Sequence, residues 1–359
     1  MSNPSLEPDA LISRLSHQPH FPEHATIEIG DPHPPDSDRA SSAGMLDRLP
    51  LEIASITLDM LDLKSLSRLA SVSLGGKRLV YAQRAYGNII TIAPQVLAGL
   101  GMIGLVDLHR PADLDAVLRT NRCAYCIQYG AFLFLPTCER CCWSCLEQNR
   151  SLRLLEPVMA KKYFGLSDEH IEQLPTVRNA RLESPDDLVL VSVKAAKTLG
   201  IAVHGSPKRM AQAMLRNRRV LGLAEGWYYH STRQQSTDVG RRLQSSVALF
   251  LEDRYLGVAS VRFPSLSESG EVVDGLWCLG CERARRTCAS KRVPEHDILM
   301  PVDWSGSAMA VSLTPERLAW YRGPFLEHIK NCSGAKKLLP ELNQRRKRAV
   351  DSLGPDTLF

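Results

Sequence analysis

The chain has no uninterrupted apolar stretch long enough to cross a bilayer. Its first 44 residues also lack the basic start and apolar centre of a secretory leader, so we expect neither a membrane span nor secretion. Aromatic residues make up only 6% of the sequence, and the net charge of +5 is small for 359 residues. So small a surplus of positive charge does not by itself favour nucleic-acid binding.

Recognisable catalytic motifs are missing as well. The sequence contains no P-loop, no nucleophile elbow and no HExxH segment. Gly99, Gly101 and Gly104 have the spacing of a dinucleotide-binding turn, but Pro94 and Pro111 interrupt the strand and the long helix that such a turn requires. We therefore expect a protein that is not an enzyme.

The chain is rich in cysteine. Most of its ten cysteines lie in CxxC pairs, which is typical of metal binding inside the cell rather than of a secreted disulfide framework. We expect a location in the nucleus or cytoplasm. The length allows two or three small domains, and a hydrophobic content of 44% is ordinary for a folded chain.

Six cysteines form a first cluster, in which a strand-like AFLFL run separates two CxxC steps. This spacing is typical of a structural zinc site. The candidate ligands are Cys123, Cys126, Cys138, Cys141, Cys142 and Cys145. Because a tetrahedral site needs four ligands, two are spare. We expect Cys123 and Cys126 to bind, with Cys138 and Cys141 favoured over the last two, since CERC resembles a zinc knuckle. Buried free thiols or a redox pair are the alternative.

A second candidate zinc site lies nearer the end of the chain. Two predicted strands joined by a Ser-Glu-Ser-Gly turn lead to the knuckle formed by Cys278 and Cys281. Downstream, His328 and Cys332 are four residues apart and so share one face of a predicted helix that Gly334 would end. Cys288 and His296 compete as ligands. The alternative is a surface histidine and unrelated buried cysteines.

Residues 46–82 contain three short apolar helical runs joined by polar steps. Pro50 suits the first turn of a helix, because its fixed φ fits there and its missing N–H would be unpaired anyway. Helices this small bury little apolar area, so we expect them to pack on a partner or on the rest of the chain. A plain helical bundle is the other interpretation. The apolar residues recur at three- and four-residue steps in two runs, Ile53, Ile56 and Met60 and then Leu63, Leu66, Leu69 and Val72.

This segment resembles the F-box, the helical module that joins a substrate receptor to the Skp-type adaptor of a cullin-RING ubiquitin ligase. The residues that carry the resemblance are Leu49, Pro50, Glu52, Ile53, Leu61, Leu66, Leu69, Val72 and Ser73. Many F-boxes have a Trp after the Val-Ser step, where this chain has Gly75 and Gly76. The docking residues expected from the resemblance are Leu49, Pro50, Ile53, Ile56, Leu66, Leu69 and Val72.

An F-box followed by ADLDAVLRTNRCAYC and FLFLPTCERCCWSC resembles the F-box proteins of filamentous fungi that carry a cysteine-rich segment, over most of residues 45–335. The resemblance implies a substrate-recognition subunit of an SCF-type ligase. Its partners would be the Skp-type adaptor, the cullin scaffold and an unknown protein target, with catalysis left to other subunits.

A zinc-dependent nucleic-acid-binding protein with a degenerate F-box is the alternative function. Lysines and arginines between residues 161 and 219 could line a phosphate-binding surface, but no stacking aromatics are interleaved with them. Solvated helix faces are the plainer interpretation.

We expect an α+β, mainly helical fold in which zinc stabilises small mixed domains. The predicted segments are a disordered tail (1–44), the F-box-like module (45–88), a helix and cysteine-rich zinc segment (89–155), a mixed helix and strand segment (156–225), a hairpin-plus-helix region (226–335) and a basic tail (336–359).

Overall fold

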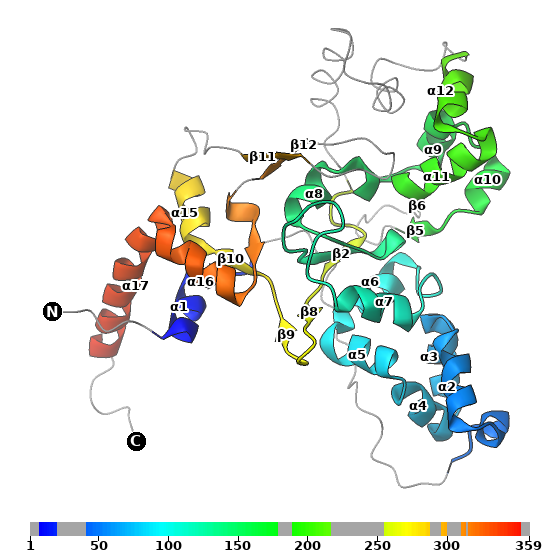
Figure 1. The fold of residues 1–359 in the computed structure, drawn as a ribbon, viewed down its shortest axis with the longest axis horizontal. Coiled ribbons are helices and arrows are strands. Elements are labelled where there is room, and N and C mark those ends of the chain that lie inside the picture. Colours follow the sequence, from blue (N-terminus) through cyan, green and yellow to red (C-terminus); the bar gives the residue numbers. More distant parts are fainter. Residues whose placement is uncertain are drawn as a thin grey trace.

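The computed structural model of the chain describes residues 7–19, 41–178, 189–216, 255–287, 296–299, 310–313 and 315–352. Within these ranges it combines helices with short antiparallel strands, as predicted, and helices predominate (Figure 1). Three groups of buried side chains form the interior: a large core around the first cysteine cluster, a smaller one around residues 155–210, and a third near the C-terminal helices.

The predicted F-box-like segment is helical. Asp62 and Ser73 cap the second and third of its helices, because their side chains accept hydrogen bonds from the backbone N–H groups of Ser65 and Gly76. The buried faces of these helices join the large core. The elements of this region are η1 (Gly44–Arg48), α2 (Leu51–Asp59), α3 (Leu63–Val72), α4 (Leu74–Tyr81), α5 (Arg84–Ile92), α6 (Pro94–Ile103) and α7 (Pro111–Leu118).

A three-stranded sheet carries the first cysteine cluster. Its central strand is β2, flanked on one side by β3 and on the other by β7, which comes from more than a hundred residues later. A helix, α8, follows β3 directly. The elements are β2 (Phe132–Phe134), η2 (Leu135–Thr137), β3 (Glu139–Cys141), α8 (Trp143–Gln148), η3 (Arg150–Leu152) and β7 (Ser260–Arg262).

The middle segment forms its own small core beside that sheet. Its strands are β4 (Leu154–Leu155), β5 (Thr176–Arg178) and β6 (Val189–Ser192), with β6 in the centre. Its helices are α9 (Pro157–Phe164), α10 (Asp168–Glu172), α11 (Val193–His204) and α12 (Pro207–Arg216). Phe164, which is fully buried, packs here with Ala160 and Val191.

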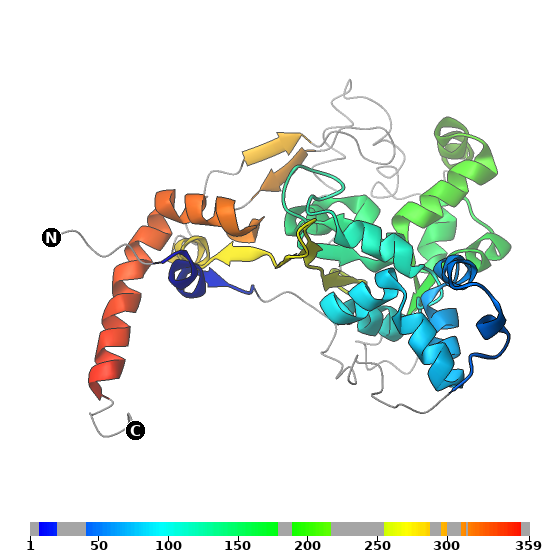
Figure 2. The ribbon, with the colours of Figure 1, turned by 60° about the horizontal axis from the view of Figure 1, so that its bottom comes forward.

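The C-terminal elements gather at the opposite end of the molecule from the F-box-like helices (Figure 2). The predicted hairpin is present as β8 paired with β9, and its turn passes through Gly270 at a positive φ. The elements are β8 (Ser265–Leu266), β9 (Val272–Val273), β10 (Leu276–Cys278), α15 (Leu279–Thr287), β11 (His296–Leu299), β12 (Ala310–Leu313), η4 (Pro315–Arg317), β13 (Ala319–Trp320), α16 (Arg322–Asn331) and α17 (Ser333–Ser352).

The prediction of a disordered tail over residues 1–44 is wrong for the part that the structure describes. Residues 8–15 form α1 and residues 16–17 form β1, which pairs antiparallel with β10. Leu15 is buried against the C-terminal helices, because those helices supply an apolar surface that no local pattern in the tail could indicate.

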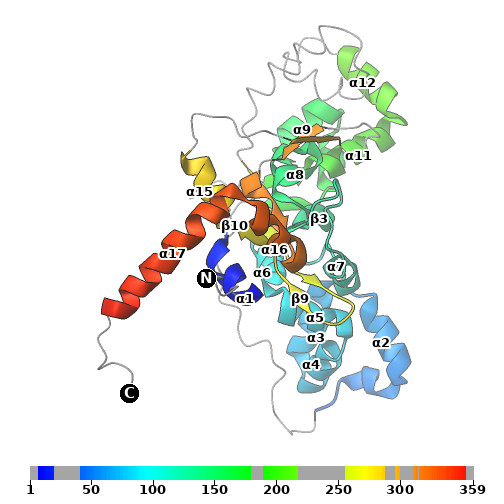
Figure 3. The same ribbon diagram turned by 60° about the vertical axis from the view of Figure 1, so that its left-hand side comes forward.

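The predicted basic tail beyond residue 336 is a continuation of helix rather than a tail, as far as residue 352 (Figure 3). Gly334 does not end a helix as expected. The break falls at Cys332 between α16 and α17, and Gly334 instead lies where the backbones of α17 and Gly280 meet with no room for a Cβ on either residue.

Among the described residues, no individual helix has both the length and the apolar character to cross a membrane; only α5 and α6 taken together do so, and the chain bends by 89° between them.

Candidate metal centres and an exposed apolar patch

The first cysteine cluster brings four thiols to one point. The Sγ atom of Cys126 lies 3.6 Å from that of Cys142 and 3.6 Å from that of Cys145. Cys123 belongs to the same group, and all four ligand atoms lie within 4.8 Å of one another. A disulfide requires about 2.0 Å, whereas four metal–sulfur bonds of about 2.3 Å in a tetrahedron place the sulfurs about 3.8 Å apart. The spacing therefore fits a metal ion.

The backbone around the cluster is shaped to hold thiolates. The N–H of Tyr125 donates to Sγ of Cys123 over 3.4 Å, and the N–H of Cys145 donates to Sγ of Cys142 over the same distance. The second contact makes Cys142 the N-cap of α8, so the positive end of the helix faces its sulfur. Each CxxC step thus offers one sulfur that accepts a backbone hydrogen bond.

The surroundings of Cys123 favour loss of its thiol proton. Hydrogen bonds from the neighbouring thiols of Cys126, Cys142 and Cys145 hold the pKa of Cys123 well below its usual value. Hydrogen bonds with Cys123 and Cys126 raise the pKa of Cys142 and of Cys145, so the group gives up the Cys123 proton first. Thiolates bind metals far better than thiols do, so Cys123 is the thiol best prepared for a metal ion.

The preference for Cys138 and Cys141 over Cys142 and Cys145 is reversed by the structure. Cys141 is the last residue of β3 and is fully buried on the sheet, and Cys138 lies in the turn before it with a φ of +52°. Neither joins the group of four. Burial raises the pKa of Cys138 to about 12 and also raises that of Cys141. The CERC step is therefore part of a strand rather than a knuckle.

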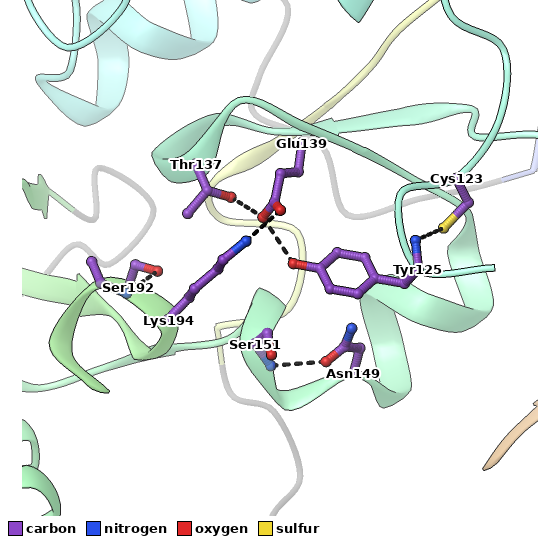
Figure 4. Close-up of polar contacts among 9 residues, drawn as sticks. Cys123, Tyr125, Thr137, Glu139, Asn149, Ser151, Ser192 and Lys194 are labelled. Carbon is purple, nitrogen blue, oxygen red and sulfur yellow. Dashed lines mark hydrogen bonds and ion pairs between the residues drawn. The ribbon is translucent and has the colours of Figure 1, made fainter. Parts of the chain in front are cut away.

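A polar network fixes the first knuckle to α11 (Figure 4). Glu139 on β3 accepts hydrogen bonds from the hydroxyls of Tyr125, at 2.8 Å, and Thr137, at 2.6 Å. The same carboxylate forms an ion pair with Lys194 on α11. Tyr125 stands between the ligands Cys123 and Cys126, so this network positions the knuckle from outside the metal centre.

Arg140, between the two spare cysteines, is 2% exposed and was not singled out from the sequence. Its guanidinium donates to the carbonyls of Gly130, Phe263 and Pro264, and to that of Val117 at 3.3 Å. Burial lowers the pKa of Arg140 to about 10. The side chain thereby ties the loop after the first knuckle to the segment that leads from β7 into β8.

The second predicted site is also assembled. The Sγ atom of Cys332 lies 3.8 Å from that of Cys278 and 3.6 Å from that of Cys281. Nε2 of His328 lies 3.3 Å from Sγ of Cys281, near the separation of about 3.5 Å that a tetrahedral metal with sulfur and nitrogen ligands requires. Cys278, Cys281, His328 and Cys332 together form the second group of candidate ligands.

This second centre is more open than the first. Cys278 is buried, but the other three ligands are only partly buried. Trp320 stacks on the His328 ring with a centroid distance of 5.0 Å and so fixes its orientation. Of the competing ligands, Cys288 lies outside the described residues, and His296 is the first residue of β11.

An exposed apolar patch covers the F-box-like helices. Ile53, Ile56 and Met60 share one face of α2 and its C-cap, and their exposed fractions are 49%, 59% and 71%. Ala54 and Leu58 form the opposite face and are buried. The helix therefore exposes large aliphatic side chains on the side away from its buried residues. We define the patch as Met45, Leu49, Leu51, Ile53, Ile56, Met60 and Val72, all at least 40% exposed.

The predicted docking residues divide into two sets. Leu49, Pro50, Ile53, Ile56 and Val72 are exposed and so accessible to a partner. Leu66 is 1% exposed and lies in the large core, where Leu69 also packs. The expectation that Leu66 contacts a partner is therefore wrong for this conformation, because α3 turns that face toward the rest of the chain.

Three of the basic residues suggested for nucleic-acid contact are paired or buried. Lys194 pairs with Glu139, Lys161 pairs with Asp168, and Lys197 is 4% exposed. The last of the series, Arg218 and Arg219, lie outside the described residues. Lys208 and Arg209, at the start of α12, are exposed.

No family model matches the chain, and no curated protein or solved structure matches it either.

Proposed function

We propose that this chain is a target receptor of an SCF-type cullin-RING ubiquitin ligase. It would dock on the Skp-type adaptor through the apolar patch and recruit an unknown protein through its C-terminal region. The observation that carries the proposal is α2, which buries Ala54 and Leu58 and leaves Ile53 and Ile56 exposed. Recognition of a small helical module by a partner depends on such aliphatic anchors.

Several features support docking rather than catalysis. The exposed aliphatic side chains lie on a rigid support, since α3 and α4 are capped and their buried faces join the large core. Seven large apolar residues between positions 45 and 72 are exposed, and exposed apolar surface of this kind marks interaction sites. The resemblance of residues 49–73 to an F-box names the adaptor as the partner.

We propose zinc as the metal of both centres, in a structural role. Four thiolates, or three thiolates and an imidazole, at tetrahedral spacing form the ligand sets that zinc prefers. A catalytic zinc keeps one coordination position for water, whereas four protein ligands close the site. Zinc supplies folding energy to such a site, and the residues around it supply orientation.

The proposal is tested by co-purification of the zinc-loaded chain with a fungal Skp-type adaptor. We expect Ile53→Asp combined with Ile56→Asp to weaken adaptor binding at least about 100-fold, since two desolvated aliphatic anchors are replaced by charges. Both side chains are about half exposed, so the free chain should keep its fold.

Val158→Asp combined with Val203→Asp is the matched control. These side chains are also exposed, at 64% and 41%, but lie on α9 and α11. Adaptor binding should survive this change. Failure of the soluble, zinc-loaded wild type to bind any adaptor would refute the receptor role, and salt-sensitive retention on DNA or RNA by the same protein would favour the nucleic-acid function instead.

A further inference from the structure

The N-terminal segment, residues 8–17, lies across the helices of the second metal centre (Figures 1 and 3). β1 extends the sheet by pairing with β10, so that Ser16 is opposite Cys278 and His17 is opposite Trp277. α1 packs against α16 and α17, where Leu15 is 2% exposed. A segment from the start of the chain is thus seated on a surface built from its end.

The receiving surface is built from the elements that carry the second group of candidate ligands. Phe325 and Ile329 form its floor on α16, and Leu338 contributes from α17. His328 and Cys332 belong to the same stretch of chain and meet the β10 ligand Cys278 at the metal. A bound metal therefore holds β10, α16 and the start of α17 together, so the groove should persist without its occupant.

The occupant itself is held by few contacts. The strand pairing spans two residues, and an eight-residue helix is marginally stable by itself. Three aliphatic side chains, Leu11, Ile12 and Leu15, enter the apolar cluster. Polar contacts add to this: Asp9 pairs with Arg322, and Arg14 donates to Asn343 over 2.5 Å. Directly after the segment, Arg262 donates to the side chain of Gln18 and to the carbonyl of Pro19. Docking within one chain needs only weak contacts, because the local concentration is on the order of millimolar.

We propose that this groove is a peptide-docking site and that residues 8–17 are its removable occupant in cis. The segment shows which chemistry the groove accepts. A partner would carry a short amphipathic helix with aliphatic side chains at positions i, i+1 and i+4, and an acidic residue two positions before the first of them. Two extended residues after the helix would pair with the edge of β10.

The use of this groove to recruit a ubiquitination target rests on the proposed receptor function, whereas the docking itself does not. A target peptide of this chemistry must displace the N-terminal segment before it can bind. The segment therefore acts as an internal competitor that raises the apparent Kd of every external ligand.

The test uses the full-length zinc-loaded chain and a fluorescent peptide with the sequence of residues 6–19. Leu11→Asp combined with Leu15→Asp in the chain should empty the groove, because charges replace the two outer anchors of α1. We expect the labelled wild-type peptide to bind this variant at least about tenfold more tightly than it binds the wild-type chain, as measured by fluorescence anisotropy.

Two peptides serve as controls. A peptide with the same two aspartates should bind neither chain. A peptide with Asp9→Arg should bind weakly to the double variant and regain affinity when the chain also carries Arg322→Asp, because the charge pair is then restored in reverse. Absence of peptide binding to a double variant that is folded and holds two zinc ions would overturn the proposal.

The unmodified chain gives a second, independent measurement. If residues 8–17 detach, their amide hydrogens should exchange faster than those of α16 under native conditions. Amide exchange in residues 8–17 as slow as in α16 would overturn the proposal. Loss of the second zinc in the double variant would also overturn it. Either result would mean that the segment is an integral part of the fold around the second centre. Adaptor binding by the double variant is measured alongside, because it reports on the receptor function separately.

Discussion

The two candidate metal centres differ in how far apart their ligands lie in the sequence and in how deeply they are buried. The first takes its four cysteines from residues 123–145, buries all of them and places them inside the large core. The second joins ligands from residues 278–332, leaves three of the four partly exposed and packs on a small separate cluster. A metal bound by buried ligands that are close in sequence would be part of the main core. A metal bound by partly exposed ligands that are far apart in sequence would instead connect separate elements.

The two centres are also physically connected. Trp143 follows the ligand Cys142, Trp277 precedes the ligand Cys278, and the ring of Phe132 lies between the two indoles at centroid distances of 6.1 Å to each. Arg317 adds a second link, because it pairs with Glu147 on α8 and lies over the Trp143 ring. Damage at the first centre should therefore spread to the second more readily than the reverse.

Ligand removal should give the largest difference between the centres. We expect Cys145→Ser to destabilise the chain by more than about 4 kcal/mol, the range reached when a structural metal is lost from a core, and to release both zinc ions. Cys332→Ser should release only one and leave the main thermal transition in place. The measurements are zinc content and thermal unfolding.

Cys138→Ser is the control for these variants, since Cys138 lies outside both groups and is only partly buried. This variant should retain two zinc ions. Retention of two ions by Cys145→Ser and loss of one by Cys138→Ser would show that the alternative wiring is correct.

Replacing Arg140 tests whether the first centre depends on its surroundings. Arg140→Met keeps the length of the side chain but removes the guanidinium donor from the buried carbonyl groups of Gly130, Phe263 and Pro264. We expect a loss of about 3 kcal/mol in the free energy of unfolding, measured by urea denaturation. Arg140→Lys should recover only part of this, because an ammonium group cannot reach carbonyls on both sides.

A chelator should remove the metal from the two centres at different rates. A chelator reaches the partly exposed ligands of the second centre more easily than the buried thiols of the first. We expect two phases of zinc release, the faster at least about tenfold ahead of the slower, a difference of about 1.4 kcal/mol in barrier. Cys332→Ser should remove the fast phase alone, and loss of the slow phase in that variant would contradict the assignment.

The smallest expected effect is on how the free energy of unfolding changes with pH, through the buried His109. His109 donates to the carbonyl of Leu135 over 2.5 Å, and burial lowers the pKa of its imidazole below 6.5. The folded state therefore disfavours protonation, so stability is fully present above about pH 6.5 and decreases as the pH falls toward the lowered pKa. We expect His109→Gln to show a shallower loss of stability over this window, measured by urea unfolding at each pH.

Some of the fold was accessible from the sequence because it depends on local chemistry. The helices between residues 51 and 81, the strand at β2, the hairpin of β8 and β9 and the helix after Cys142 follow from apolar spacing, capping residues and turn chemistry. The structure also brings together the predicted candidate ligands of the second centre, Cys278, Cys281, His328 and Cys332.

The missed features depend on contacts between distant segments. The pairing of β2 with β7 and of β1 with β10 joins residues far apart in the chain, and so do the hydrogen bonds of Arg140. In the first cluster the CERC spacing suggested a knuckle, but pairing of Glu139–Cys141 with β2 made this stretch a strand. Pairing with the neighbouring strand β2 decides that this stretch is a strand and not a knuckle. The spacing of the cysteines alone does not reveal that pairing.

The N-terminal segment also carries a consequence for synthesis on the ribosome. α1 emerges first, yet the strand with which β1 pairs is made roughly 260 residues later, a delay of about 13 to 50 seconds at ordinary translation rates. During that interval Leu11, Ile12 and Leu15 have no groove to enter. The nascent chain therefore exposes these apolar side chains to chaperones until α16, which ends at Asn331, and the start of α17 have left the exit tunnel.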